Sequence, residues 1–317
     1  MAKRSALVLA PFLCWLLCTM AVQEAGAGRP GSIGGSAGAD GGRARLVVVA
    51  SIFPLADLVR QIGGEQVEVE TLLPPGASPH TFEPTPRQVQ RFSRAQVFAR
   101  IGAGLELWAE KLLGSRKPSP RVMTAAEGIP LFKGTEGVDP HQSFGDPHIW
   151  LDPVLVRTAI LPRIVETLGA AAPQHVATFR ERARRYSVEL EQLDRQIRER
   201  VSHWQGRKFI VFHSAWRYFG RRYGLQQISA IVESPGKEPS ARDIAHLVDV
   251  ARAHGVHVIF CEPQFNPKPA QVIAQEMKGR VLTLDPLGGE GLPGRNTYIG
   301  LMNYNLRALE AGLKVSG

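Results

Sequence analysis

Three histidines and one aspartate each lie in a turn-rich segment or directly after an apolar run that predicts a strand. His80 lies in a Pro- and Gly-rich stretch (74–86), where the prolines prevent regular structure and stiffen the loop. His148 lies in a segment with two Asp-Pro pairs (146–153). His213 directly follows the apolar run 209–212, and Asp285 directly follows the run 281–284. These four residues are the candidate metal ligands.

Three imidazoles and one carboxylate form a closed tetrahedral set that suits Zn²⁺. The four residues are 65 to 72 positions apart in the chain, so their spacing alone does not bring them together. Taken singly, a histidine at the end of a strand is more often a hydrogen-bonded structural residue. The residue types are therefore compatible with a metal site, but they do not show that the four residues form one.

Alternating apolar runs and amphipathic stretches predict an α/β fold with mostly parallel sheets flanked by helices. The expected strands are 46–50, 67–73, 97–101, 209–212, 256–260 and 281–284, and the expected helices are 55–62, 105–113, 215–223, 270–278 and 297–313. Open α/β sheets bind ligands beyond the carboxyl ends of their strands. His213 and Asp285 both lie where that rule places a site.

One segment interrupts this alternation. From 173 to 204 the apolar residues recur every three or four positions, and no Gly or Pro follows Pro173. This pattern predicts one long helix. A coiled-coil dimer seam is an alternative. Because an α/β half lies on each side, we interpret the helix as a rigid connection between two lobes.

The four motifs, in this order and at these separations, resemble those of the cluster A-I solute-binding proteins of zinc and manganese ABC transporters. The resemblance runs from about Arg45 to the C-terminus and includes the long helix and the segments 213–219 and 262–265. It implies two α/β lobes joined by a rigid helix, with one metal ion between them. It also implies that His80, His148, His213 and Asp285 bind the metal, with no catalytic residue and no bound cofactor. The expected partners are the metal ion and an ABC permease, and a monomer is expected.

The identity of the third ligand bears on the metal. Members of this family that look manganese-selective tend to have Glu where this chain has His213, and imidazole suits Zn²⁺. The resemblance therefore favours zinc, with a manganese-binding member as the alternative. Many zinc members also carry a long His- and Asp-rich loop between the first two motifs. Here the segment 134–145 offers only Glu136, Asp139 and His141, so His141 is a weak auxiliary candidate.

Imidazoles bind metals only when neutral, so we expect affinity to fall below about pH 6.5, the unperturbed histidine pKa. The remaining histidines are expected on helix surfaces or strand edges: His175, His203, His246, His254 and His257.

The N-terminus carries the features of an export signal. Lys3 and Arg4 precede an apolar stretch, and a small-residue cleavage site follows at 25–27. We expect a signal peptide at 1–27, a Gly-, Ala- and Ser-rich spacer at 28–44, an N-terminal lobe at 45–170, a linking helix at 171–204 and a C-terminal lobe at 205–317. The predicted location is periplasmic. A retained anchor is an alternative, whereas the residues before Cys14 and Cys18 do not favour a lipoprotein.

Charge and cysteine content bear on which partners and which cysteine chemistry the protein can have. The net charge of +9 is spread along the chain, with its densest run at 180–185 inside the long helix, so a solvated basic surface is favoured over nucleic-acid or lipid binding. After signal removal Cys261 is the one cysteine left, in an apolar run where a buried thiol is expected.

Two other functional classes, a zinc hydrolase and a surface adhesin, fit the residues less well. A zinc hydrolase would keep an open metal position beside a general base, for which Glu83 is the nearest candidate. A surface adhesin would not need the four-ligand set. We predict a binding protein and not an enzyme.

Overall fold

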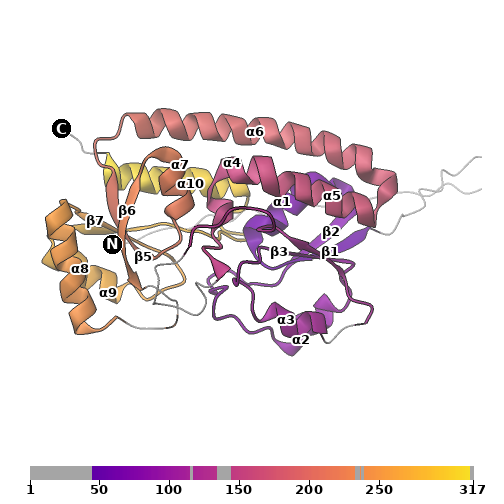
Figure 1. The fold of residues 1–317 in the computed structure, drawn as a ribbon, viewed down its shortest axis with the longest axis horizontal. Coiled ribbons are helices and arrows are strands. Elements are labelled where there is room, and N and C mark those ends of the chain that lie inside the picture. The colour runs from indigo at the N-terminus through magenta and orange to yellow at the C-terminus, as the bar shows by residue number, and fades with distance from the viewer. Residues whose placement is uncertain (1–44, 115–116, 134–143, 233–235, 237–238, 315–317) are drawn as a thin grey trace, which may run out of the picture. The chain divides into compact units, whose positions relative to one another are not determined.

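Two parallel four-stranded sheets organise the residues that the structure describes (Figure 1). The computed structural model describes residues 45–114, 117–133, 144–232, 236 and 239–314. The predicted signal peptide and spacer, and the candidate His141, lie outside these residues. Among the described residues, no helix has both the length and the apolar character that crossing a bilayer requires.

The first sheet has the strand order β2-β1-β3-β4, and every neighbouring pair is parallel. Its strands are β1 (Leu46–Ala50), β2 (Val67–Thr71), β3 (Val97–Arg100) and β4 (Arg121–Thr124). The central strands β1 and β3 are almost wholly buried, which explains why their sequences are continuous apolar runs.

The second sheet repeats this order as β6-β5-β7-β8, again with parallel neighbours. Its strands are β5 (Lys208–His213), β6 (Gln226–Val232), β7 (Val258–Cys261) and β8 (Arg280–Thr283). Cys261 is buried with a free thiol, as the apolar run predicted. In both sheets the carboxyl ends of the two central strands lie at the same edge, and β5 ends on His213 there.

The remaining regular elements are helices, several of which connect successive strands. They are α1 (Phe53–Gly63), α2 (Pro86–Phe92), α3 (Ala109–Gly114), α4 (Pro153–Leu155), α5 (Leu161–Ala171), α7 (Arg217–Tyr223), α8 (Ala241–His254), α9 (Lys268–Glu276) and α10 (Tyr298–Leu313). A π-helical turn (Val156–Ile160) joins α4 to α5. The α/β fold class with two parallel sheets is confirmed.

Several predicted boundaries were wrong. The helix expected at 105–113 begins only at Ala109, because two glycines with positive φ precede it and Glu106 folds back to accept from the amides of Ile101 and Gly102. The strand expected at 67–73 ends at Thr71. The sequence interpretation also missed β4 and β6, which are partly exposed and carry few continuous apolar residues. It missed the helices α2, α4, α5 and α8 as well.

The long helix α6 (Val176–Ser202) follows a 3₁₀ turn at Pro173–His175 and has 27 residues. At 1.5 Å per residue it extends about 40 Å. Its buried stripe confirms the predicted spacing and consists of Phe179, Tyr186, Leu190, Leu193, Ile197 and Val201. Figure 1 shows α6 running from the helices of the first sheet to those of the second.

Polar contacts fix both ends of α6. Arg182 Nε donates to the carbonyl of Gln61 at the end of α1 (2.9 Å), and Gln196 bonds to Asn303 of α10 (3.1 Å). One continuous hydrophobic cluster contains residues of β1, α6 and β5. The helix α6 therefore packs against the helices that cover both sheets, as expected of a rigid connection. The exact boundaries of the two lobes stay a prediction.

This packing predicts little change in dimensions when metal binds. A helix with all its backbone bonds made resists bending unless Pro, Gly or an insertion breaks the ladder, and α6 contains neither residue. We expect the radii of gyration of metal-free and zinc-loaded protein to differ by less than about 1 Å in small-angle X-ray scattering. A change of several ångströms would reveal a hinge and contradict the rigid connection.

Candidate metal centre

Three of the four predicted residues come together. The donor nitrogens of His80, His148 and His213 all lie within 4.8 Å of one another. The ring centroids are 5.4 Å apart for His80 and His148, 5.0 Å for His80 and His213, and 4.9 Å for His148 and His213. In the described part of the chain, this is the group of histidine, cysteine and carboxylate side chains whose geometry could hold a metal ion.

The separation of the closest nitrogens matches that of two ligands on one zinc ion. His80 Nε2 and His148 Nε2 are 3.4 Å apart. Two nitrogens bound at 2.0–2.1 Å with a tetrahedral angle would be separated by about 3.4 Å. The rings are therefore already near the spacing that a shared ion requires.

His80 sits on a loop whose two ends are tied by one side chain. The loop follows β2 and leads to the capping box of α2, in which Thr85 and Gln88 bond to each other's backbone amides. Gln88 Nε2 also donates to the carbonyl of Leu72 at the loop's start (2.7 Å). Trp108 Nε1 donates to the carbonyl of Pro79 (3.0 Å), next to the histidine. This half-buried loop holds His80 by its backbone.

His148 is buried and held by a carboxylate two residues before it. Asp146 Oδ1 lies 2.8 Å from His148 Nδ1 and also accepts from the backbone amide of His148 (3.0 Å). Because Nδ1 faces this carboxylate, Nε2 is the nitrogen that points to His80. Tyr218 of α7 donates its hydroxyl to the carbonyl of Asp146 (2.9 Å), so a residue from the second half of the chain also supports this candidate ligand.

His213 is buried at the carboxyl end of β5, as the apolar run predicted. Its Nδ1 lies 3.4 Å from Oε1 of Glu262, which follows β7 directly. Phe265 packs beside the imidazole with ring centroids 5.8 Å apart. The strand end thus fixes the backbone, and the segment after the neighbouring strand contacts the ring.

Asp285 is almost fully buried, but the structure does not place it in the histidine group. Its Oδ1 accepts from the amides of Leu287 (3.0 Å) and Gly288 (2.9 Å). Its Oδ2 forms an ion pair with Arg295 Nη1 at 2.8 Å. Asn305 holds its backbone by bonding to both its amide and its carbonyl. Its role as a ligand stays a prediction.

Comparison with known proteins identifies the protein family to which this sequence is similar. Residues 48–312 match the protein family described as "ZnuA: Zinc-uptake complex component A periplasmic". The chain belongs to this family. The resemblance inferred from the four motifs is thereby confirmed.

Several proteins with sequences or structures similar to this chain are named as metal-uptake or metal-binding proteins. The "High-affinity zinc uptake system protein ZnuA" of Bacillus subtilis is 29% identical over 287 residues, which cover 86% of this chain and 88% of that protein. A zinc-bound deletion mutant of ZnuA is 30% identical, with a TM-score of 0.76 over 86% of this chain and 100% of the other. The laminin-binding protein Lmb of Streptococcus agalactiae, described as having adhesin and metal-transporting activity, is 30% identical with a TM-score of 0.75, covering 85% of this chain and 100% of its own.

Burial keeps two of the three imidazoles uncharged in this family member. Loss of solvation lowers the pKa of His148, although Asp146 opposes this effect, and it lowers the pKa of His213 to about 4. The same loss of solvation raises the pKa of the Glu262 carboxyl well above its usual range. Neutral imidazoles are metal ligands without losing a proton first. The expected decline of affinity below about pH 6.5 therefore does not come from His213.

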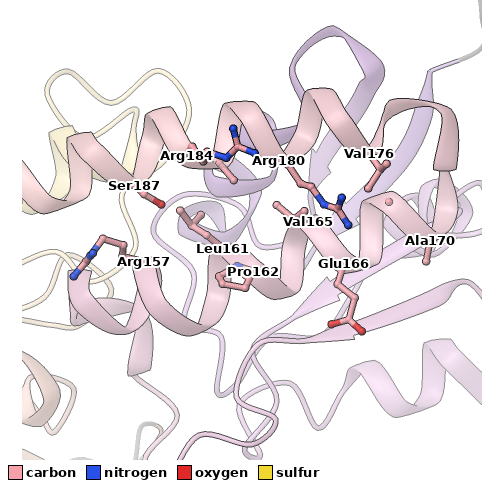
Figure 2. Close-up of a pocket in the computed structure, with 12 residues that line it drawn as sticks. Arg157, Leu161, Pro162, Val165, Glu166, Ala170, Val176, Arg180, Arg184 and Ser187 are labelled. Carbon is pink, nitrogen blue, oxygen red and sulfur yellow. The ribbon is translucent and has the colours of Figure 1, made fainter.

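The pocket beside the long helix is not the metal centre. A pocket of about 570 Å³ lies between α5 and α6 (Figure 2). Leu161, Val165 and Val176 form part of its apolar lining, with Arg157 and Arg180 beside them. None of the four predicted ligands lines it. A metal ion needs only a shell of donors, so cavity volume does not locate its site.

Sequence reasoning missed three side chains that contact the predicted ligands. Asp146 lies in the second motif, two residues before His148 and separated from it by Pro147. This Asp-Pro-His sequence was a signal that could have identified Asp146. Glu262 stands inside a segment that carried the family resemblance. Arg295 had no signal, because only the folded loop after β8 brings it to Asp285. The five other histidines are exposed or half-buried, as expected.

The lowered pKa of His213 predicts a pH-dependent stability. The folded pKa of about 4 lies below the unperturbed value of about 6.5, so the unfolded chain takes up the proton first as pH falls. The stability that neutral His213 contributes is therefore lost between about pH 6.5 and 4. Compared with a His213→Gln variant, metal-free wild-type protein should lose up to about 3 kcal/mol of unfolding free energy over this window.

Urea denaturation of both proteins from pH 7 to pH 4 measures this difference. The comparison cancels the titration of carboxyl groups that both proteins share. A difference that stays constant with pH would contradict the uncharged state of His213.

Proposed function

We propose that this protein captures Zn²⁺ on the outer side of the inner membrane and delivers it to an ABC-type importer. The observation that carries the proposal is the convergence of three imidazoles from segments far apart in the chain. Membership of the zinc-uptake family and the zinc-bound relative support the same function.

We further propose Asp285 as the fourth ligand, giving a set of His80, His148, His213 and Asp285. Asp285 follows β8, so it lies at the same edge of the second sheet as His213. Each oxygen of a carboxylate accepts two hydrogen bonds or metal contacts. The bonds to Leu287, Gly288 and Arg295 therefore leave capacity for an ion.

Zinc is favoured over manganese by the donor set. Three nitrogen ligands suit Zn²⁺, whereas Mn²⁺ prefers oxygen donors. A manganese-bound neighbour has 21% identity and a TM-score of 0.76, which supports a common fold and no more. Manganese binding stays the alternative that the titration below tests.

A binding function without catalysis accounts for the surroundings of the site. The general base of a zinc hydrolase stands beside the metal-bound water. Glu83, the candidate for that role, is exposed three residues beyond His80. Glu262 and Asp146 instead contact the Nδ1 atoms of the histidines. We propose that the protein releases its cargo unchanged.

The remaining features of the proposal rest on the sequence. Residues 1–27 act as the export signal, 28–44 as a spacer, and the mature protein works as a monomer in the periplasm. The two lobes, 45–170 and 205–317, would present their surfaces to the permease on either side of the linking segment 171–204.

Zinc titration of the purified mature protein tests the function directly. We expect one Zn²⁺ per chain by isothermal titration calorimetry, and binding of Mn²⁺ weaker by about 10-fold or more because the donors are mainly imidazoles. Preference for Mn²⁺, or two equivalent tight sites, would contradict the proposal.

Single ligand variants test the assignment within the same assay. Replacing His148 or His213 by Ala should weaken zinc binding by roughly 100-fold or more, since each removes a donor. His203→Ala is the matched control, because His203 is exposed at the end of α6. Equal effects of His203→Ala and His213→Ala would rule out this ligand set.

A further inference from the structure

Glu262 is a buried carboxylate whose oxygens have no hydrogen-bond partner. The residue is 3% exposed, and neither Oε1 nor Oε2 has a hydrogen bond. Burying a polar group without a partner costs free energy, and a buried charge costs more. Folding stability alone therefore does not account for an acidic residue at this position.

The pairing of two strands explains where this side chain points. β5 and β7 are parallel neighbours, with Val211 paired to Phe260. Continuing this register by two residues brings His213, the last residue of β5, beside Glu262, the residue that follows β7. Alternate residues of a strand share a face, so both side chains lie on the same side of the sheet edge. Oε1 lies 3.4 Å from His213 Nδ1.

We propose that Glu262 is the positioning residue of His213 in the metal-bound state. The inference rests on the proposed zinc function. The carboxylate accepts the Nδ1 proton of His213, which fixes the tautomer and presents Nε2 to the ion. Metal-binding histidines typically donate their second nitrogen to such a partner, which also makes them stronger ligands. The charge of the incoming Zn²⁺ offsets the cost of the buried carboxylate.

The other half of the centre already shows this arrangement. Asp146 Oδ1 and His148 Nδ1 are 2.8 Å apart. In this pair the carboxylate precedes its histidine in the same loop, whereas Glu262 reaches its histidine from the neighbouring strand. The two pairs face the His80 ring from different segments, and each leaves an Nε2 for the ion.

The segment that follows Glu262 holds the same ring from a second side. Phe265 stacks on Phe212 with ring centroids 4.8 Å apart and an interplanar angle of 14°. It also packs against His213. The segment 262–265, which carried part of the family resemblance, thus gains a role: its first residue sets the tautomer and its last limits rotation of the ring.

A direct ligand role for Glu262 does not agree with the geometry. Its oxygens are not among the donor atoms that lie within 4.8 Å of one another. A purely structural role does not agree with its missing hydrogen bonds. The two alternatives predict different responses to Glu262→Gln, which keeps the shape and removes the charge.

The test compares wild type, Glu262→Gln, His213→Ala and the control Glu276→Gln, an exposed residue of α9. Three properties are measured for each protein: Zn²⁺ affinity by competition with a chromophoric chelator, the melting temperature without metal, and the visible absorption spectrum with Co²⁺ in place of zinc.

We expect Glu262→Gln to weaken Zn²⁺ binding about 10- to 100-fold, the range typical of partners behind a metal ligand. Its melting temperature without metal should be equal to or above that of wild type, since the variant removes an unpaired buried acid. Its Co²⁺ spectrum should keep the wild-type form, because the ligand set is unchanged. Glu276→Gln should match wild type in all three.

Three results would overturn the assignment while leaving the proposed function intact. Wild-type affinity in Glu262→Gln would show that the carboxylate does not act on His213. A loss as large as that of His213→Ala, with an altered Co²⁺ spectrum, would make Glu262 a ligand. If Glu262→Gln lowered the melting temperature of the metal-free protein as well as its Zn²⁺ affinity, the role of Glu262 would be structural. Wild-type protein that binds neither Zn²⁺ nor Co²⁺ would instead contradict the proposed function, and the assignment with it.

Discussion

The structure depends on holding three imidazole rings side by side, two of them buried in their uncharged form. If His148 and His213 were protonated, their positive charges would repel each other and the incoming cation at ring separations of about 5 Å. Burial removes this possibility by lowering both pKa values. The low solvent exposure of the centre therefore keeps these two imidazoles in the neutral form that a metal ion requires of its ligands.

Keeping the rings in place requires the two sheets to be joined near the centre as well as through α6. The segment around His148 makes these connections. Trp150 Nε1 donates to the carbonyl of Pro286, and Tyr298 donates its hydroxyl to the carbonyl of Trp150, both at 2.8 Å. Arg222 of α7 forms an ion pair with Asp152 at 2.8 Å. Since the loop of His148 bonds to residues before and after β8, displacing one half of the chain would break several buried polar contacts at once.

Much of this arrangement could be predicted from the sequence. The apolar runs located β1 and most of β5, and the Pro- and Gly-rich stretch placed His80 on a stiff loop. The spacing of apolar residues located α6 because a 27-residue amphipathic pattern has few other interpretations. Each of these features is encoded within one continuous segment.

What could not be predicted depends on contacts between segments. Glu262 becomes the neighbour of His213 only through the register of β5 with β7. Asp285 is engaged by Arg295, which no periodicity connects to it. Strands such as β6 carry polar residues on a partly exposed face, so their apolar pattern is weak. Local patterns thus located the candidate ligands, whereas the side chains that contact them could be found only from the fold.

X-ray absorption at the zinc edge tests the central claim most directly, because it reports the atoms bound to the ion. The account predicts that zinc-loaded protein shows multiple scattering from three imidazole rings and one further oxygen ligand, all at about 2.0–2.2 Å. A spectrum with sulfur ligation at about 2.3 Å, or with fewer than three imidazoles, would contradict it.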